Sequence, residues 1–215
     1  MSDLKFVSLA DSAFESLEND ILSGVYEKGD ILTEISLSEK LGISRTPIRE
    51  AVRRLEQEKL VKLLPKGIEI IGLTKEDIDD IYAVRIMLEG EATARFAERA
   101  DDDDLKTLSD IVDLQEFYTK KNKAEDINQT DSKFHDYIYK NCGSDVFSSI
   151  LSSLHRKVQK YRKISIQDSD RAISAVEEHK KIYEAIANHD KELSKKLVSE
   201  HITNAHNSIV NNLKK

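Results

Sequence analysis

The sequence predicts a mainly α-helical protein in two parts, with mixed structure over residues 1–74 and nearly unbroken helix over residues 75–215. Both prolines and five of the seven glycines lie in the first third of the chain, which indicates turns there and long helices afterwards. The chain is 34% charged and only 6% aromatic. That balance is typical of solvated helices rather than of β-sandwiches, and 215 residues are enough for two small domains.

The first part is expected to hold three helices and a hairpin. An apolar stripe from Leu9 to Leu22 has helical spacing and ends at Gly24. Thr33 is a suitable N-cap for a short helix that stops at Gly42. Ser44 or Thr46 can cap the next helix, and Pro47 is tolerated in its first turn. Residues 61–63 and 68–70 alternate like strands around a basic turn, which predicts a β-hairpin.

The second part is expected to form about six helices. Their apolar periodicity places them near residues 75–99, 102–120, 123–142, 144–166, 169–188 and 190–212.

The composition also limits where in the cell the protein is expected and which partners it is expected to bind. Cys142 is the single cysteine, so a disulfide within the chain is excluded, and a buried hydrophobic role is expected for it. We find neither a signal-peptide pattern nor an apolar run long enough to span a membrane, which predicts a cytoplasmic protein without a membrane partner. The net charge of −7 argues against nucleic-acid binding, but residues 44–66 carry seven basic and three acidic side chains, a local excess of positive charge.

That basic segment has the pattern of a helix-turn-helix. A short helix and a tight turn precede a helix on which Arg45, Arg49 and Arg53 share one face. The second helix of such a motif enters the major groove. There an arginine can make a bidentate hydrogen bond to guanine or bind phosphate. The alternative is a solvated arginine face without a ligand, which the order of turn, helix and basic hairpin disfavours.

The segment SRTPIREAVRRLE, which starts at Ser44, resembles the winged helix of GntR-type regulators. The resemblance implies double-stranded DNA as partner, with the DNA-contacting residues Ser44, Arg45, Thr46, Pro47 and Arg49 in the helix and Lys66 and Gly67 in the wing. Some members have an arginine early in the preceding helix that contacts phosphate. Here Thr33-Glu34-Ile35 occupies that stretch, so that contact is not expected.

Histidines on three expected helices are candidate metal ligands. Asp131 and His135 are one helical turn apart on an apolar face, and His179 and His201 each lie on the apolar stripe of another helix. Imidazoles with one carboxylate suit a divalent metal. The alternative is three core histidines with satisfied hydrogen bonds. His155, His189 and His206 lie at or beyond the edges of their stripes and are expected at the surface.

The C-terminal part resembles the FCD effector domain of the FadR subfamily, an antiparallel helical bundle. The segments DSKFHDYI, EEHKKIYEAIANHD and SEHITNAH carry the resemblance. It implies that Asp131, His135, His179 and His201 hold a divalent metal, with zinc expected first and nickel or manganese as alternatives. Six helices rather than seven would suggest the smaller VanR-like branch.

Two arginines are candidates for binding an anionic effector. Arg85 falls on an apolar stripe, where it can pair with Glu89 as a structural ion pair or hold an effector carboxylate beside the metal. Arg162 lies near the inward edge of its helix.

Two-fold symmetry lets two recognition helices read two half-sites, so we expect a homodimer on a palindromic operator. The family resemblance implies a repressor that a small carboxylate releases from DNA. Activation remains open. A metal-dependent enzyme is an alternative, but no general base, phosphate loop or nucleophile elbow is found. A protein-interaction module is a third interpretation, supported mainly by the net acidity.

Overall fold

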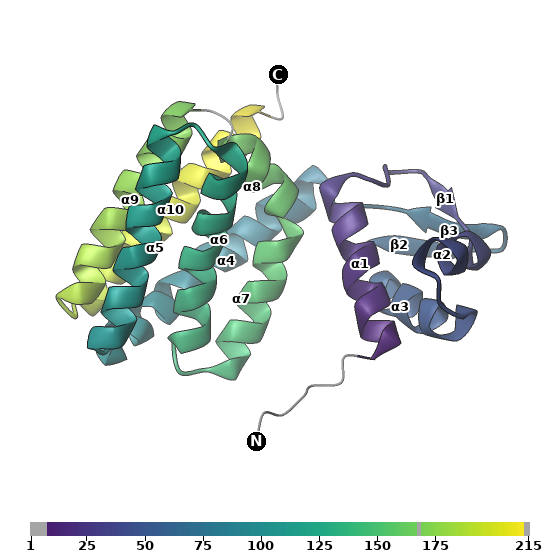
Figure 1. Ribbon diagram of the computed structural model, residues 1–215, viewed down its shortest axis with the longest axis horizontal. Coiled ribbons are helices and arrows are strands. Elements are labelled where there is room, and N and C mark those ends of the chain that lie inside the picture. The colour runs from purple at the N-terminus through teal and green to yellow at the C-terminus, as the bar shows by residue number, and fades with distance from the viewer. Residues whose placement is uncertain (1–7, 167–168, 213–215) are drawn as a thin grey trace. The chain divides into compact units, whose positions relative to one another are not determined.

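The computed structural model describes residues 8–166 and 169–212, and these form two compact units that divide between Lys75 and Glu76. The described residues hold ten helices and one small antiparallel sheet, which confirms the predicted fold class (Figure 1). None of the described helices has the length and apolar character needed to cross a membrane.

The N-terminal unit is a winged helix-turn-helix. Its elements are α1 (Leu9–Ser23), β1 (Ile31–Leu32), α2 (Glu34–Leu41), α3 (Arg45–Gln57), β2 (Val61–Leu64) and β3 (Gly67–Ile70). The strand order is β1-β3-β2, and both pairings are antiparallel. β2 and β3 form the predicted hairpin. β1 was not predicted from the sequence, because two residues are too few to show an alternating pattern.

Local capping explains where these helices begin and end. The Thr33 hydroxyl accepts from the Ser36 backbone N–H, and the Ser36 hydroxyl accepts in turn from the Thr33 N–H. Gly24 and Gly42 end α1 and α2 with positive φ values of 81° and 66°. Ser44 is the N-cap of α3, but its side chain makes no capping hydrogen bond. The apolar faces of α1 and α3 then pack together over the hairpin, with Leu17, Ile48 and Leu55 almost completely buried.

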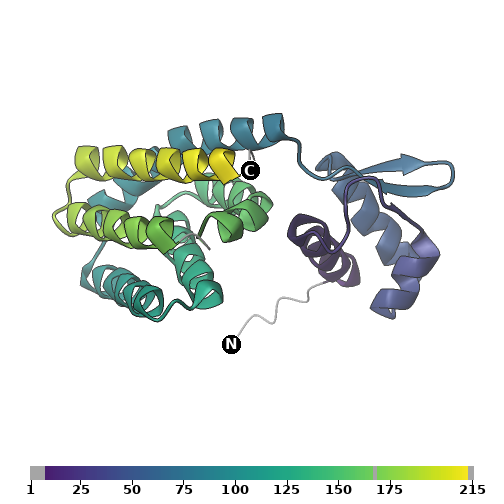
Figure 2. The same cartoon turned by 90° about the horizontal axis from the view of Figure 1, so that it is seen from above.

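The second unit is all helical. Its elements are α4 (Lys75–Arg99), α5 (Asp102–Lys120), α6 (Ala124–Asn141), α7 (Asp145–Lys157), α8 (Gln159–Ile166), α9 (Ser169–Ala187) and α10 (Lys191–Asn212). Short turns join α5 to α6 and α9 to α10, and each pair packs side by side as an antiparallel hairpin (Figure 2). Asn122 and His189 adopt positive φ at these two turns.

The predicted helix over 144–166 is wrong, because α7 ends at Lys157 and α8 begins at Gln159. The described part of this unit therefore has seven helices rather than six, so the helix count does not by itself indicate the smaller branch. The break falls at Val158, which is buried and has φ −95° and ψ 6°. Neither glycine nor proline marks it, and buried residues continue on both sides, so hydrophobic periodicity could not reveal it.

We expect Gly67→Ala to destabilise the N-terminal unit. Gly67 has φ 151°, and a Cβ there would lie 2.5 Å from the Leu32 carbonyl oxygen on β1. The strained backbone and the overlap should lower the unfolding free energy by about 2–4 kcal/mol, measured by urea unfolding. Gly42→Ala is the control: φ is 66°, and a Cβ there would have nothing within 4 Å, so only about 1 kcal/mol should be lost. Equal losses would contradict the close approach of β1.

Candidate metal centre and nucleic-acid interface

The predicted DNA-contacting residues of α3 are exposed, apart from Pro47. Arg45 and Arg49 are about half exposed on α3, and Arg53 is exposed one turn further on. Ser44 and Thr46 are exposed at the start of the same helix, and Pro47 is half-buried. The opposite face of α3 holds Ile48, Ala51, Val52 and Leu55 in the core. The arginine side chains therefore lie on the face of α3 that is exposed to solvent.

The predicted wing residues lie at the tip of the hairpin. Leu64 pairs with Gly67, so Pro65 and Lys66 form the two-residue turn between β2 and β3. Lys66 is exposed and Gly67 is half-buried against β1. Gly67 therefore has a structural reason to be glycine that is independent of any contact with DNA.

An acidic side chain that was not predicted from the sequence bridges two of the arginines. Glu34, at the start of α2, accepts from Arg49 Nε at 2.8 Å and 2.9 Å and from Arg45 Nη2 at 3.1 Å. Hydrogen bonds from Arg49 in particular lower the pKa of Glu34 below its usual value. No sequence signal pairs residues that are 11 and 15 positions apart on different helices.

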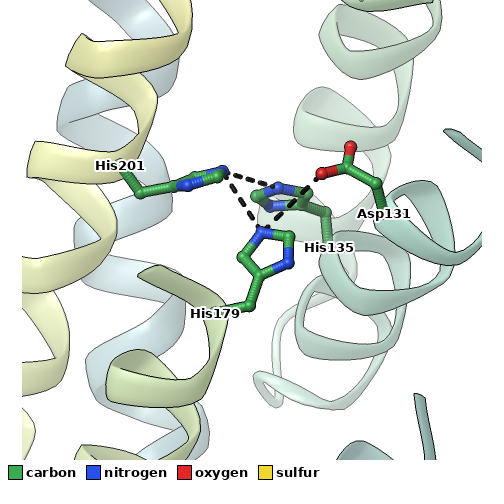
Figure 3. A group of neighbouring side chains, drawn as sticks. All are labelled: Asp131, His135, His179 and His201. Carbon is green, nitrogen blue, oxygen red and sulfur yellow. Dashed lines mark hydrogen bonds and ion pairs between the residues drawn. The ribbon is translucent and has the colours of Figure 1, made fainter. Parts of the chain in front are cut away.

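Four predicted metal ligands meet inside the helical unit (Figure 3). Asp131 and His135 project from α6, His179 from α9 and His201 from α10. All four are buried, and one ligand atom from each lies within 4.8 Å of the others. His201 Nε2 is 3.2 Å from His135 Nε2 and 3.3 Å from His179 Nε2. Asp131 Oδ1 lies 3.8 Å from His179 Nε2.

Each imidazole also has a side-chain oxygen within 3.2 Å of its other ring nitrogen. His201 Nδ1 lies 2.6 Å from Glu178 Oε2, and His179 Nδ1 lies 2.7 Å from Gln115 Oε1. His135 Nδ1 is 3.2 Å from Glu89 Oε2, without hydrogen-bond geometry. Carboxylates and carbonyl oxygens only accept, so the contacts of His179 and His201 place the single proton of each of these neutral rings on Nδ1. His179 Nε2 and His201 Nε2, which lie 3.3 Å apart, are then both unprotonated.

The electrostatics of the cluster favour neutral rings around a charged carboxylate. Burial lowers the pKa of His179 well below its usual value, and the neighbouring His201 adds to the effect. Burial likewise lowers the pKa of His201, although Glu178 opposes it. Burial would raise the pKa of Asp131, but the Arg162 guanidinium keeps it well below the usual range. Neutral imidazoles and an ionised carboxylate are the forms that bind a metal.

The spacing suits a single ion. At a metal–nitrogen distance of about 2.1 Å, two nitrogens 3.2–3.3 Å apart subtend about 100° at the ion. That angle lies between the octahedral and tetrahedral values. Nδ1 contacts to carboxylate or amide oxygen are what histidine ligands usually make. These four residues could therefore bind a divalent metal.

Arg85 takes the structural pairing that was one of its two predicted roles. It is buried on α4, and its Nε donates to Glu89 Oε1 at 2.7 Å. Burial would raise the pKa of Glu89, but the Arg85 guanidinium lowers it to about 2. Arg85 Nη1 and Tyr82 Oη are nevertheless buried without a hydrogen bond in the described part of the protein. The ion pair thus leaves donors unused.

His155 is buried, so its predicted surface position is wrong. His155 Nδ1 lies 3.4 Å from Arg85 Nη2, and its Nε2 contacts Arg162 Nη1. Burial lowers the pKa of His155 well below its usual value, and the Arg162 and Arg85 guanidiniums lower it further. Hydrophobic periodicity did not predict the burial of His155, because its contacts in the core are polar: the guanidiniums of Arg85 and Arg162. His189 is exposed as predicted, and His206 is half-buried on Tyr82.

A small cavity adjoins the cluster of Asp131 and the three histidines. Its volume is about 20 Å³, and its lining includes Tyr82, Arg85, Asp131, Arg162 and His201. A space of this size holds about one water molecule. Arg162 is buried beside it and contacts the Asp131 carboxylate. The predicted effector residues Arg85 and Arg162 therefore do line one space next to the cluster.

An N-terminal winged helix-turn-helix joined to a separate helical unit is the architecture of a DNA-binding regulator. Family models agree: residues 9–67 match "Bacterial regulatory proteins, gntR family", and residues 80–204 match the FCD domain. The chain belongs to the GntR family of bacterial transcription regulators and carries an FCD domain. It is a regulator rather than an enzyme.

Relatives with known names support this assignment. The chain is 28% identical over 190 residues to the uncharacterized HTH-type transcriptional regulator YdhC of Bacillus subtilis, covering 87% of this chain and 85% of that protein. It is 33% identical over 148 residues to the gluconate operon transcriptional repressor of Bacillus licheniformis, covering 68% and 60%. The solved structure of McbR/YncC from E. coli has the same fold, with a TM-score of 0.81 at 21% identity over 97% of this chain and 100% of that one.

Removing one member of the buried Arg85–Glu89 pair should lower the unfolding free energy more than removing both. We expect Arg85→Met to lower the unfolding free energy of metal-free protein by about 3–5 kcal/mol, because Glu89 is left buried and uncompensated. The double variant Arg85→Met/Glu89→Leu should recover most of this loss in urea unfolding.

The matched control is Arg95→Met, which breaks the exposed Arg95–Glu91 pair of the same spacing on the same helix. It should cost less than about 1 kcal/mol. A double variant as unstable as Arg85→Met alone would show that the Arg85–Glu89 pair is not the source of the loss.

Proposed function

We propose that this regulator is a homodimeric repressor whose binding to a palindromic operator is released by a small carboxylate, bound beside a divalent metal in the helical unit. The repressor role is supported by relatives named as gluconate operon repressors. The single observation that carries the metal and effector part is the convergence of three histidine Nε2 atoms beside two buried arginines.

The convergent nitrogens support the metal because they are unfavourable without a cation. The unprotonated Nε2 atoms of His179 and His201, 3.3 Å apart, present lone pairs that repel one another, and burial excludes water that could separate them. His135, His179, His201 and Asp131 would hold the ion. Zinc is our first choice, with nickel and manganese as alternatives, because all three accept imidazole and carboxylate. When bound, the metal would supply a positive centre with positions left for a further oxygen ligand.

The arginines support an anionic effector. Arg85 Nη1 and Tyr82 Oη are buried donors without a partner among the described residues, and each such group is costly unless a ligand satisfies it. His155 lies between two guanidiniums that can only donate, although a neutral ring accepts at only one nitrogen. This side of the cluster is rich in donors and short of acceptors. A carboxylate would supply the missing acceptors.

The small cavity indicates how the effector would act. About 20 Å³ is too little for a carboxylate of several atoms, so the lining must move for the effector to bind. We propose that Arg162 leaves Asp131 and that α8 adjusts. A ligand that favours the adjusted arrangement shifts the protein towards it. Operator binding would respond if that arrangement is less compatible with DNA.

We assign the DNA contacts to the exposed face of α3 and to the wing. The Ser44 side chain makes no capping hydrogen bond, so its hydroxyl is available to DNA. The other proposed contacts on or beside that face are Arg45, Thr46, Pro47, Arg49 and Arg53. Lys66 and Gly67 at the hairpin tip would lie against the phosphate backbone. Two copies related by a two-fold axis would place two such helices on two half-sites.

The test begins with the metal. Protein purified without chelator should contain about one divalent ion per chain by elemental mass spectrometry. His135→Ala and His179→Ala should lose it. His189→Ala is the matched control, because His189 is exposed and bonds only the Ala97 carbonyl among the contacts described.

The effector is tested next on an operator selected from random-sequence DNA. With metal bound, at least one small carboxylate should weaken operator binding tenfold or more. Gluconate is the first probe, and sorbitol, which lacks the carboxylate, is its control. Arg162→Met should abolish the response while leaving operator binding intact. Metal-free protein that still responds, or a response that survives Arg162→Met, would contradict the proposed site.

A further inference from the structure

The carboxylate of Glu34 fixes two neighbouring guanidiniums on the proposed DNA-facing surface. Glu34 lies at the first position of α2, and it holds Arg49 Nε by two oxygens and Arg45 Nη2 by one. Arg45 and Arg49 are one turn apart on α3, so a single side chain reaches both. These contacts form within the N-terminal unit and need no ligand.

The geometry leaves the DNA-facing donors of Arg49 available. Its bonds to Glu34 use only Nε, and no other hydrogen bond of its two Nη groups is found among the described residues. Arg49 is still about half exposed while held. Two parallel Nη donors on a fixed plane match the O6 and N7 acceptors of guanine. A free arginine would have to lose rotamer freedom to reach the same geometry.

The carboxylate also makes binding to the DNA backbone less favourable. Its negative charge lies within 3.1 Å of both guanidiniums, so it competes with phosphate for them. Non-specific binding depends almost entirely on such phosphate contacts. Specificity is a difference between affinities, and a group that opposes the wrong complex raises it.

We propose that Glu34 is a specificity-determining residue: it holds Arg49 and Arg45 ready for guanine and weakens their attraction to phosphate. This rests on the proposed DNA contacts of Arg45 and Arg49. Glu34 itself is a positioning residue, since it acts through the two arginines. The short exposed pair adds little to folding stability, so its effect should appear in sequence preference rather than in thermal stability.

Two variants separate the effect of the charge of Glu34 from the effect of its side-chain length. Glu34→Gln keeps the length and removes the charge. Glu34→Asp keeps the charge at the start of α2 but shortens the side chain, so it cannot reach both arginines. Glu39→Gln, on the exposed face of the same helix, is the control for net charge. Each full-length protein is used to select sites from random duplexes, and binding to unselected random duplex is titrated with salt.

We expect Glu34→Gln to bind random duplex about five- to tenfold more tightly near 0.1 M salt and to steepen the salt slope by about one. Its selected sites should show weaker preference for guanine, with the ratio of specific to random binding reduced about tenfold. Glu34→Asp should lose guanine preference with little change in salt slope. Glu39→Gln should retain the wild-type preference.

Wild-type preference in both Glu34 variants would overturn the proposal. So would equal changes in Glu34→Gln and Glu39→Gln, which would assign the effect to net charge alone. Arg49→Ala tests the underlying assumption separately, beside Arg54→Ala, whose guanidinium contacts Asp11 and Phe14 on α1 instead. If Arg49→Ala binds operator no worse than Arg54→Ala, the proposed DNA surface itself is wrong. If only Arg49→Ala fails while the Glu34 variants match wild type, only this inference is wrong.

Discussion

The meeting of His135, His179 and His201 constrains most of the helical unit, because three helices must bring polar rings to one buried point. The Nδ1 atoms of His179 and His201 bond Gln115 and Glu178, and His135 Nδ1 lies 3.2 Å from Glu89. These partners come from α4, α5 and α9, so the cluster ties together helices that contribute no ligand as well as those that do. Neutral histidines so arranged would normally be a defect in a hydrophobic core. A bound cation would make the arrangement favourable.

The same polar network extends from the cluster to the cavity. Glu89 faces His135 with one oxygen and binds Arg85 with the other. Asp131 is a candidate ligand and also the partner of Arg162. A change of charge at the cluster must therefore alter the two arginines that line the cavity, since low-dielectric surroundings strengthen each interaction. This sharing of partners is the physical basis of our proposal that the metal and the effector bind in one site.

Sequence patterns predicted the elements that repeat or that have marked ends. Helical spacing located α1 and the long helices, and the order of turn, helix and basic hairpin indicated the winged unit. Apolar stripes also located all four candidate ligands, because each ligand lies on a buried face.

What the sequence could not predict depends on contacts between distant residues. The break at Val158 has no glycine or proline to mark it. His155 is drawn inward by Arg85 and Arg162, which lie 70 and 7 residues away. Glu34 meets the α3 arginines only after the turn at Gly42 folds the two helices together. Patterns within one element cannot contain such information.

The proposed metal site depends on the tautomer that the three rings adopt, and nitrogen NMR of the histidine side chains measures it directly. In metal-free protein, His135, His179 and His201 should each carry the proton on Nδ1, with Nε2 unprotonated. One equivalent of zinc should then shift all three Nε2 signals together and leave His189 unchanged. Protonated Nε2 in these rings, or signals that do not respond to the metal, would contradict the claim that the core is built around a cation.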